Sequence, residues 1–149
     1  MKIAIATDHN GVDQKYEIIK KLSDYEFLDK SPNNYSTDDY PDFAFEVAKS
    51  VASKEVDLGI LMCGTGIGMS IAANKVKGIR CGHCSNIEEA HLTREHNHAN
   101  IIAISYKKDL NEIIAMIEEF IKTNPSEEER HQRRVNKIIN YEKDAYNEL

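Results

Sequence analysis

The chain has 149 residues, of which 41% are apolar and 30% are charged. This length suits one domain, so we expect residues 1–149 to form a single globular domain rather than two. No apolar run approaches the roughly 20 residues of a membrane helix, which excludes a membrane-spanning protein. The first residues lack the apolar core and cleavage site of a signal peptide, so a cytoplasmic location is expected.

The formal charge is −6, from 19 basic and 25 acidic side chains. Because no overall positive field would attract nucleic acid or an anionic membrane, neither is expected as a partner. An anionic ligand must instead be held by a local arrangement of groups. The three cysteines are an odd number, and in a reducing compartment they would remain thiols, so we expect no disulfide framework.

Apolar runs alternate with amphipathic stretches along the whole chain. In chain order, the expected elements are a strand at 2–7, a helix from 12, a strand at 26–28, a helix from 41, a strand at 58–62, a helix at 69–76, a strand opening at 78–81, a helix at 88–95, a strand at 99–104 and a helix at 110–121. Ser126 and Glu129 have the spacing of a capping box, which predicts a last helix through Arg130 to about Tyr141.

This alternation predicts an α/β fold, a Rossmann-like three-layer αβα sandwich with a five-stranded, mostly parallel sheet and an extra C-terminal helix. In such sheets ligands bind beyond the carboxyl ends of the strands, near the point where the strand order reverses. We therefore expect Asp8, His9 and the segment 63–68 to lie on the same rim, together with residues that follow the fourth and fifth strands.

Cys63 ends an apolar strand and opens a glycine-rich turn into a helix, where a thiol is expected to ionise more readily than a free one. The alternative is a buried structural cysteine. Gly64, Gly66 and Gly68 let successive amides converge on an anion. The loop follows the third strand and lacks the spacing of dinucleotide or P-loop motifs, which leaves a small anion hole beside a nucleophile or base.

Three histidines near residues 91–98 compete as proton donors or acceptors, and the neighbouring amide of Asn97 could hold a hydroxyl. Arg130 and Arg134 share a helix face, either as a clamp for phosphate or as part of a solvated basic helix. Cys81 and Cys84 resemble half of a zinc site. We reject that interpretation because no second ligand pair has metal spacing and Cys81 falls on a predicted buried strand, so no metal and no cofactor are expected.

With these motifs, the sequence resembles the type B ribose-5-phosphate isomerases and the related galactose- and allose-6-phosphate isomerases. The matching stretches cover nearly the whole chain in the family's order, and they are 8–11, 39–41, 59–75, 78–80, 94–97 and 130–135. The central stretch is long and highly specific. The resemblance implies an aldose–ketose isomerase that moves a proton between C1 and C2 of a sugar phosphate through an enediolate.

The resemblance also implies roles for individual residues. Cys63 corresponds to the catalytic base, Thr65 to a hydroxyl that assists at the substrate oxygens, His96 to the group that opens the furanose ring, and Asp8 to a carboxylate near the sugar. Among the binding residues, Tyr40 lines the pocket, Asn97 holds a hydroxyl, the backbone of Gly64, Gly66, Ile67 and Gly68 forms the anion hole, and His9, Arg130 and Arg134 take the phosphate. Lys107 stands where the family commonly has a phosphate-binding arginine.

The family is dimeric or tetrameric, and the segment at His96 and Asn97 reaches a neighbour's site, so the resemblance implies that a lone subunit is incomplete. The expected reaction interconverts ribose 5-phosphate and ribulose 5-phosphate. Two alternatives stay open. One is a hexose 6-phosphate isomerase acting on allose or galactose phosphate. The other is a phosphosugar-binding module without catalysis, suggested by the altered segment 105–108.

Overall fold

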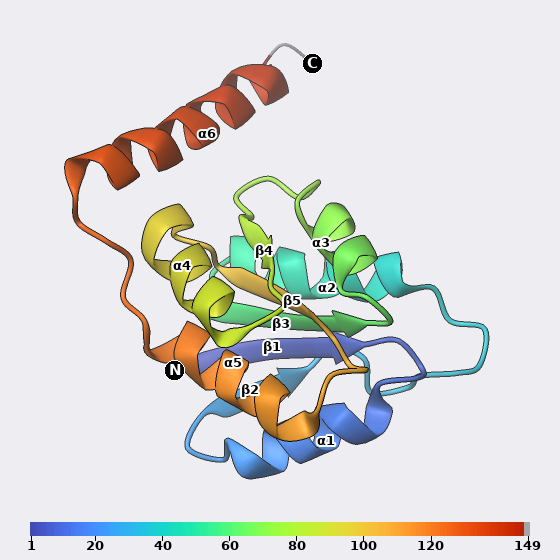
Figure 1. The fold of residues 1–149 in the computed structure, drawn as a ribbon. Helices are drawn as coiled ribbons and strands as arrows, with labels where there is room; N and C mark the ends of the chain where they lie inside the picture. Colours follow the sequence, from blue (N-terminus) through green and yellow to red (C-terminus); the bar gives the residue numbers. More distant parts are fainter. Residues whose placement is uncertain (148–149) are drawn as a thin grey trace.

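The structure is a computed structural model that describes residues 1–147 (Figure 1). Its strands are β1 (Lys2–Thr7), β2 (Glu26–Asp29), β3 (Leu58–Cys63), β4 (Cys81–His83) and β5 (Ile101–Ser105). Its helices are α1 (Val12–Lys21), α2 (Tyr40–Ala52), α3 (Ile67–Ala73), α4 (Ile87–Asn97), α5 (Leu110–Lys122) and α6 (Glu129–Asn147). The alternation of strands and helices predicted from the sequence is confirmed.

The five strands form one sheet in the order β2-β1-β3-β5-β4, and every neighbouring pair is parallel. The strand order reverses between β1 and β3, because the chain first adds β2 on one side of β1 and then crosses to the other side. The register pairs Thr7 with Met62 and Cys63 with Ser105. The carboxyl ends of the three central strands therefore meet at one edge of the sheet.

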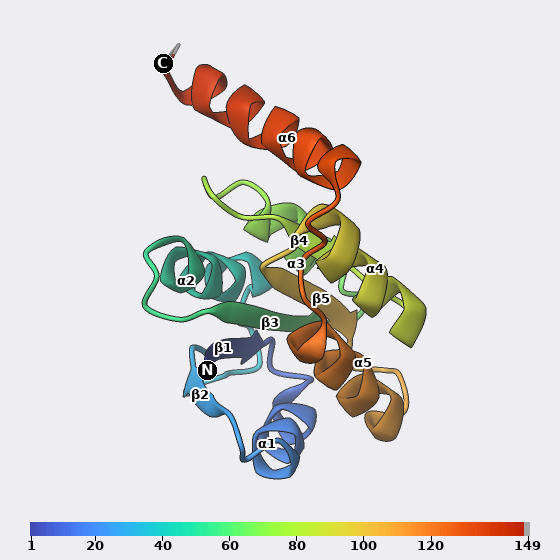
Figure 2. The same cartoon turned by 90° about the vertical axis from the view of Figure 1, so that its left-hand side faces the viewer.

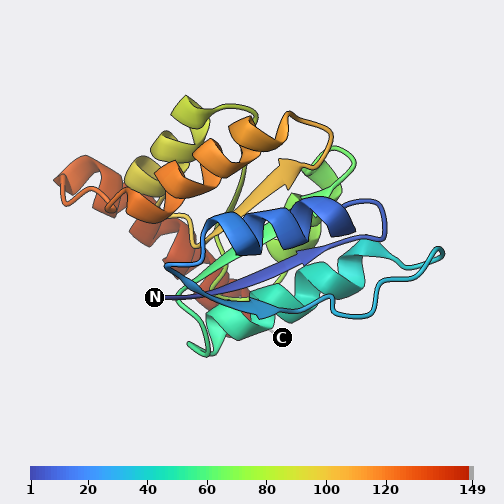
Figure 3. The same ribbon diagram turned by 90° about the horizontal axis from the view of Figure 1, so that it is seen from below.

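Helices cover both faces of the sheet, as the sequence predicted (Figure 3). Along β1 the side chains alternate: Ile3 and Ile5 pack toward α1, α4 and α5, whereas Ala4 and Ala6 pack toward α2 and α3. β3 is buried along its whole length, in agreement with its continuous apolar sequence. The described part of the chain contains no helix with the length and apolar character needed to cross a bilayer.

α6 is the extra C-terminal helix, and it stands clear of the three layers (Figure 2). Its start rests on the end of α4, and the Glu142 carboxylate near its other end accepts a hydrogen bond from the Gly78 amide at 2.8 Å. A cleft of about 590 Å³ separates the helix from the body of the molecule and is lined in part by Ile79, Ile138 and Tyr141.

Three details differ from the sequence prediction. The fourth strand begins at Cys81, because Gly78 has a φ of +91° and turns the chain before the strand can pair. This strand lies at the edge of the sheet and leaves Cys81 only half-buried, so the predicted buried strand is wrong. The capping box also fails to form: the Ser126 hydroxyl accepts from the Glu128 amide, at 3.1 Å, and α6 runs on to Asn147.

Candidate active site

The carboxyl ends of β1, β3 and β5 bring together several of the residues that the sequence singled out. Asp8 and His9 follow β1, Cys63 ends β3, and Lys107 follows β5. A Cβ placed on Gly64 would lie 3.9 Å from the Lys107 ammonium nitrogen, so that cation sits over the glycine-rich turn. The predicted common rim is confirmed for this group, and it coincides with the point where the strand order reverses.

Cys63 is the last residue of β3, and 5% of its surface is exposed. The Gly66 amide donates a hydrogen bond to its Sγ at 3.2 Å. Gly66 adopts a φ of +81°, and a Cβ there would lie 2.9 Å from the Ile104 carbonyl carbon, so only glycine fits this turn. The turn thus directs a main-chain donor at the sulfur.

Thr65 is exposed at the tip of the same turn. Its hydroxyl accepts from the Ile67 amide at 3.1 Å, which leaves the hydroxyl proton available to a ligand. The exposed His83 on β4 contacts this turn, with its Nε2 2.9 Å from the Thr65 carbonyl oxygen. Sequence reasoning gave His83 no role in this turn, because the contact joins two strands that are separated by a third one, β5.

Tyr40, at the start of α2, packs against the beginning of α3. A Cβ on Gly68 would lie only 2.6 Å from the Tyr40 ring carbon Cζ. The glycine at this position is therefore what allows the phenol to lie against the turn. α3 begins at Ile67, and the first amides of a helix have no acceptor within it, so the turn can offer donors next to Tyr40.

His9 is held by a carboxylate that sequence reasoning missed. Asp38 Oδ1 lies 2.8 Å from His9 Nδ1 and also accepts from the His9 amide at 3.1 Å. Its other oxygen accepts from the Asn34 side chain at 3.0 Å and the Tyr35 amide at 3.1 Å. Burial opposes ionisation of Asp38, but these hydrogen bonds outweigh it and lower its pKa. Only the folded chain brings Asp38 to His9, since 29 positions separate them.

Four predicted site residues lie at the opposite edge of the sheet from Cys63. His96 and Asn97 end α4, shortly before β5 begins at Ile101, whereas Cys63 is paired with the far end of β5. They therefore lie at the amino ends of the strands, roughly 15 Å of strand away from Cys63. Arg130 and Arg134 are exposed on the first turns of α6, at that same edge (Figure 1). Within one chain, these residues are not brought to the cysteine.

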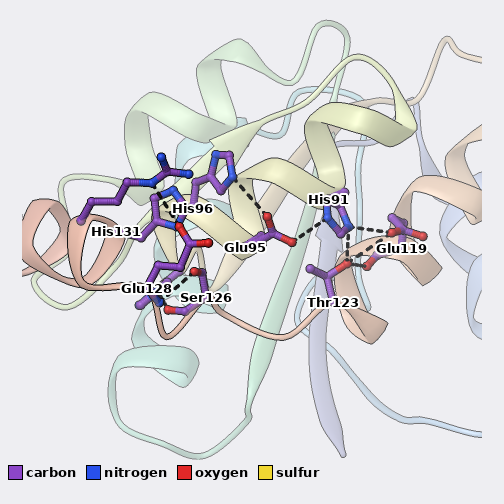
Figure 4. A network of polar contacts seen from close by, with 10 residues as sticks. His91, Glu95, His96, Glu119, Thr123, Ser126, Glu128 and His131 are labelled. Atoms are coloured by element: carbon purple, nitrogen blue, oxygen red, sulfur yellow. Dashed lines mark hydrogen bonds and ion pairs between the residues drawn. The ribbon is translucent and has the colours of Figure 1, made fainter.

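A polar network joins the ends of α4 and α5 to the start of α6 (Figure 4). The Glu95 carboxylate lies 2.9 Å from His91 Nε2 and 3.2 Å from His96 Nε2. On its other side, His91 Nδ1 is 2.8 Å from Glu119. Hydrogen bonds that His91 donates to Glu119 and Glu95 outweigh desolvation and raise its pKa. His96 is therefore tied to its own helix through Glu95.

His96 also stacks on His131 of α6, with ring centroids 4.2 Å apart and 27° between the ring planes. His131 is buried, and its Nδ1 has no hydrogen-bond partner among residues 1–147. Burial, followed by the neighbouring His96 and Arg130, lowers the pKa of His131. The stack thus holds the start of α6, with Arg130 and Arg134, against the end of α4.

The other two cysteines differ from Cys63. Burial raises the pKa of Cys81 and of Cys84 to about 12, so both remain thiols at neutral pH. Across residues 1–147, no three His, Cys, Asp or Glu side chains are grouped so that they could hold a metal ion. Cys63 is thus the candidate nucleophile or base among the three.

A thiol at the switch point of a parallel sheet, with a glycine turn, two nearby basic side chains and several hydroxyls, is typical of an α/β enzyme that acts on a small anionic ligand. The family profile described as Ribose/Galactose Isomerase matches residues 3–138. A putative sugar phosphate isomerase of Bacillus subtilis is 48% identical over 146 residues, covering 95% of this chain and 97% of that relative.

Solved structures agree in fold as well. Ribose-5-phosphate isomerase B of Clostridium thermocellum matches with a TM-score of 0.91 at 42% identity, covering 97% of this chain and 99% of that one. The ribose-5-phosphate isomerase B of Mycoplasma genitalium, solved with bound ribulose-5-phosphate, matches with a TM-score of 0.89 at 44% identity, covering 95% of this chain and 96% of that one. The chain belongs to the ribose/galactose isomerase family. The resemblance and the fold class predicted from the sequence are confirmed.

Proposed function

We propose that this chain is a single sugar-phosphate isomerase domain that interconverts ribose 5-phosphate and ribulose 5-phosphate, with Cys63 as the base. The observation that carries the proposal is the Cys63 sulfur, at the switch point of the sheet, accepting a hydrogen bond from the Gly66 amide. Relatives named for this reaction align over nearly the whole chain, which supports the same substrate here.

In the proposed reaction, the Cys63 thiolate takes the proton from C2 of the open-chain aldose. The electron pair of that C–H bond forms a C1–C2 double bond, and the carbonyl oxygen at C1 becomes an enediolate oxygen. The C2 hydroxyl then gives its proton to the C1 oxygen. The electron pair of the double bond takes the proton back from Cys63 at C1, and C2 becomes the carbonyl carbon of the ketose, which restores the thiolate. Donors aimed at the developing oxyanion supply much of the stabilisation, and each is typically worth about 3 kcal/mol. In this proposal the Thr65 hydroxyl, which already accepts from the Ile67 amide, and the backbone of the turn supply these donors.

We further propose that a second copy of the chain completes the site. His9 and Lys107 are the nearby basic side chains of one chain, whereas His96, Asn97 and the two arginines of α6 lie at the opposite edge of the sheet. The protruding α6, the cleft beneath it, and exposed apolar side chains support a homodimer or a tetramer built from such dimers. These exposed side chains are Ile67, Ile71, Ile138, Ile139 and Tyr141.

The test is an isomerase assay with ribose 5-phosphate in the presence of EDTA, run alongside allose 6-phosphate and galactose 6-phosphate. The highest kcat/KM is expected for the pentose phosphate. A preference for either hexose phosphate would instead assign the longer substrate. In deuterated water, label must enter the sugar at C1 or C2. Binding of the sugar phosphate without incorporation of deuterium would instead indicate a phosphosugar-binding module without catalysis.

A further inference from the structure

Tyr106 brings a phenol hydroxyl to this site, and the proposed reaction steps give it no role. It follows β5, and its amide donates to the Cys63 carbonyl at 3.2 Å. Its own carbonyl accepts from the Gln14 side chain at 3.3 Å. The backbone of Tyr106 is thereby tied both to the end of β3 and to α1, so the position of the residue is fixed relative to the cysteine.

The side chain of Tyr106 spans the space between the turns that follow β1 and β3. A Cβ on Gly11 would lie 3.2 Å from ring carbon Cδ1, and a Cβ on Gly64 would lie 3.7 Å from the phenol oxygen. The ring packs partly against the hydrophobic core, whereas the hydroxyl points to the first residue of the anion-binding turn. The phenol oxygen is therefore delivered to the rim beside Cys63.

The surroundings of the hydroxyl keep it protonated. Burial is the largest cause that raises the pKa of Tyr106, and the negative charges of Asp8 and Cys63 raise it further, while a hydrogen bond with Asn10 acts in the opposite direction. Asp8, when ionised, can only accept hydrogen bonds. The Gly66 amide already donates to the cysteine sulfur. At neutral pH the phenol is thus a hydrogen-bond donor next to the base.

We propose that the Tyr106 hydroxyl contacts the substrate and donates a hydrogen bond to an oxygen at the reacting end of the sugar phosphate. This inference rests on the proposed isomerase function for the identity of the substrate. It adds a donor to those of the glycine turn. An anionic oxygen formed next to an ionised Asp8 requires neutral or cationic donors around it, and Tyr106 and Lys107 are both within about 4 Å of the position of a Gly64 Cβ.

The informative variant is Tyr106→Phe, because it removes the hydroxyl and keeps the ring between Gly11 and Gly64. Tyr16→Phe is the matched control, since it removes a phenol hydroxyl that is exposed on α1. We expect kcat/KM for ribose 5-phosphate to fall about 100-fold in Tyr106→Phe, at the lower end of the loss for an oxyanion donor. The control should stay within twofold of the parent protein.

Binding is measured separately from turnover. In a Cys63→Ala background, calorimetry should show that adding Tyr106→Phe raises the Kd for ribose 5-phosphate several-fold. In the otherwise unaltered protein carrying ¹³Cζ-labelled tyrosine, the resonance that Tyr106→Phe removes should shift when ribose 5-phosphate is added. This second measurement is made on the parent sequence, and the variant serves only to assign the resonance.

The outcomes separate the two proposals. If the protein binds ribose 5-phosphate without isomerising it, the isomerase function is overturned, and the Kd and the tyrosine resonance still decide the role of Tyr106. If kcat/KM and Kd both stay within twofold in Tyr106→Phe, or the resonance stays unmoved on saturation, the contact with Tyr106 is refuted. A protein that neither binds nor converts ribose 5-phosphate refutes both.

Discussion

The Asp38 carboxylate holds both the amide and the imidazole of His9, at 3.1 and 2.8 Å. With Nδ1 donating to Asp38, His9 presents Nε2 to the rim of the site, where one third of the side chain is exposed. We predict that Asp38→Asn raises KM for ribose 5-phosphate more than it lowers kcat, because the imidazole loses its fixed orientation. Steady-state kinetics would show this, and a change confined to kcat would contradict it.

The same carboxylate makes stability dependent on pH. Its side chain is almost fully buried, and its hydrogen bonds lower its pKa below the unfolded value of about 3.9. The resulting stabilisation is present above the unfolded pKa and is lost as the pH falls through the folded pKa. We predict that Asp38→Asn costs about 1–3 kcal/mol of unfolding free energy near neutrality. Urea titrations should show that the difference in unfolding free energy between the parent protein and Asp38→Asn becomes smaller below about pH 4.

Two glycines of the turn predict contrasting effects of alanine. In Gly66→Ala, the new methyl group meets the Ile104 main chain and must adopt a φ of +81°, so we expect a loss of at least about 1–2 kcal/mol. In Gly68→Ala, the three atoms nearest to the methyl group all belong to the Tyr40 side chain, which can rotate away. This variant should keep most of its stability and lose activity. Thermal melts and assays on both variants would separate the effects, and equal Tm losses would contradict the prediction.

The proposed sharing of the site between two chains predicts complementation. Cys63→Ala and His96→Ala should each be inactive as pure proteins. When they are mixed, unfolded and refolded together, half of the dimers are mixed, and each contains one intact site, so about a quarter of the parent activity is expected. A mixture as inactive as its components would show that each chain builds its own site. Co-refolding of Cys63→Ala with Cys63→Ser is the matched control and should recover nothing.

The three thiols predict a selective alkylation. Cys81 and Cys84, with pKa values raised to about 12, should stay unmodified by iodoacetamide at neutral pH, whereas Cys63 should react. Mass spectrometry of the intact protein should show one added group, which disappears in Cys63→Ala. Saturating ribose 5-phosphate should slow the reaction. Modification of Cys84 at a comparable rate would contradict this assignment.

The fold was predictable from sequence because strands buried on both faces and striped helices leave strong local patterns, as at residues 58–62 and 110–121. The start of β4 could not be predicted from the sequence, because it depends on the positive φ of one glycine, Gly78. For the site, position after a strand was sufficient to place Cys63 on the rim with Asp8 and His9. The contacts of Asp38, His83 and Tyr106 at the site were not predicted, because they depend on packing between segments that are distant in the sequence, which no local spacing reveals.

Cys63 occupies the end of a strand that is paired on both sides, with its carbonyl bonded to the Tyr106 amide and its side chain nearly covered. Local unfolding cannot expose this sulfur before the central strands of the sheet separate. The main chain around it should rank among the slowest to exchange its amide hydrogens with deuterium. On heating, the reactive centre is expected to persist until the central strands themselves come apart.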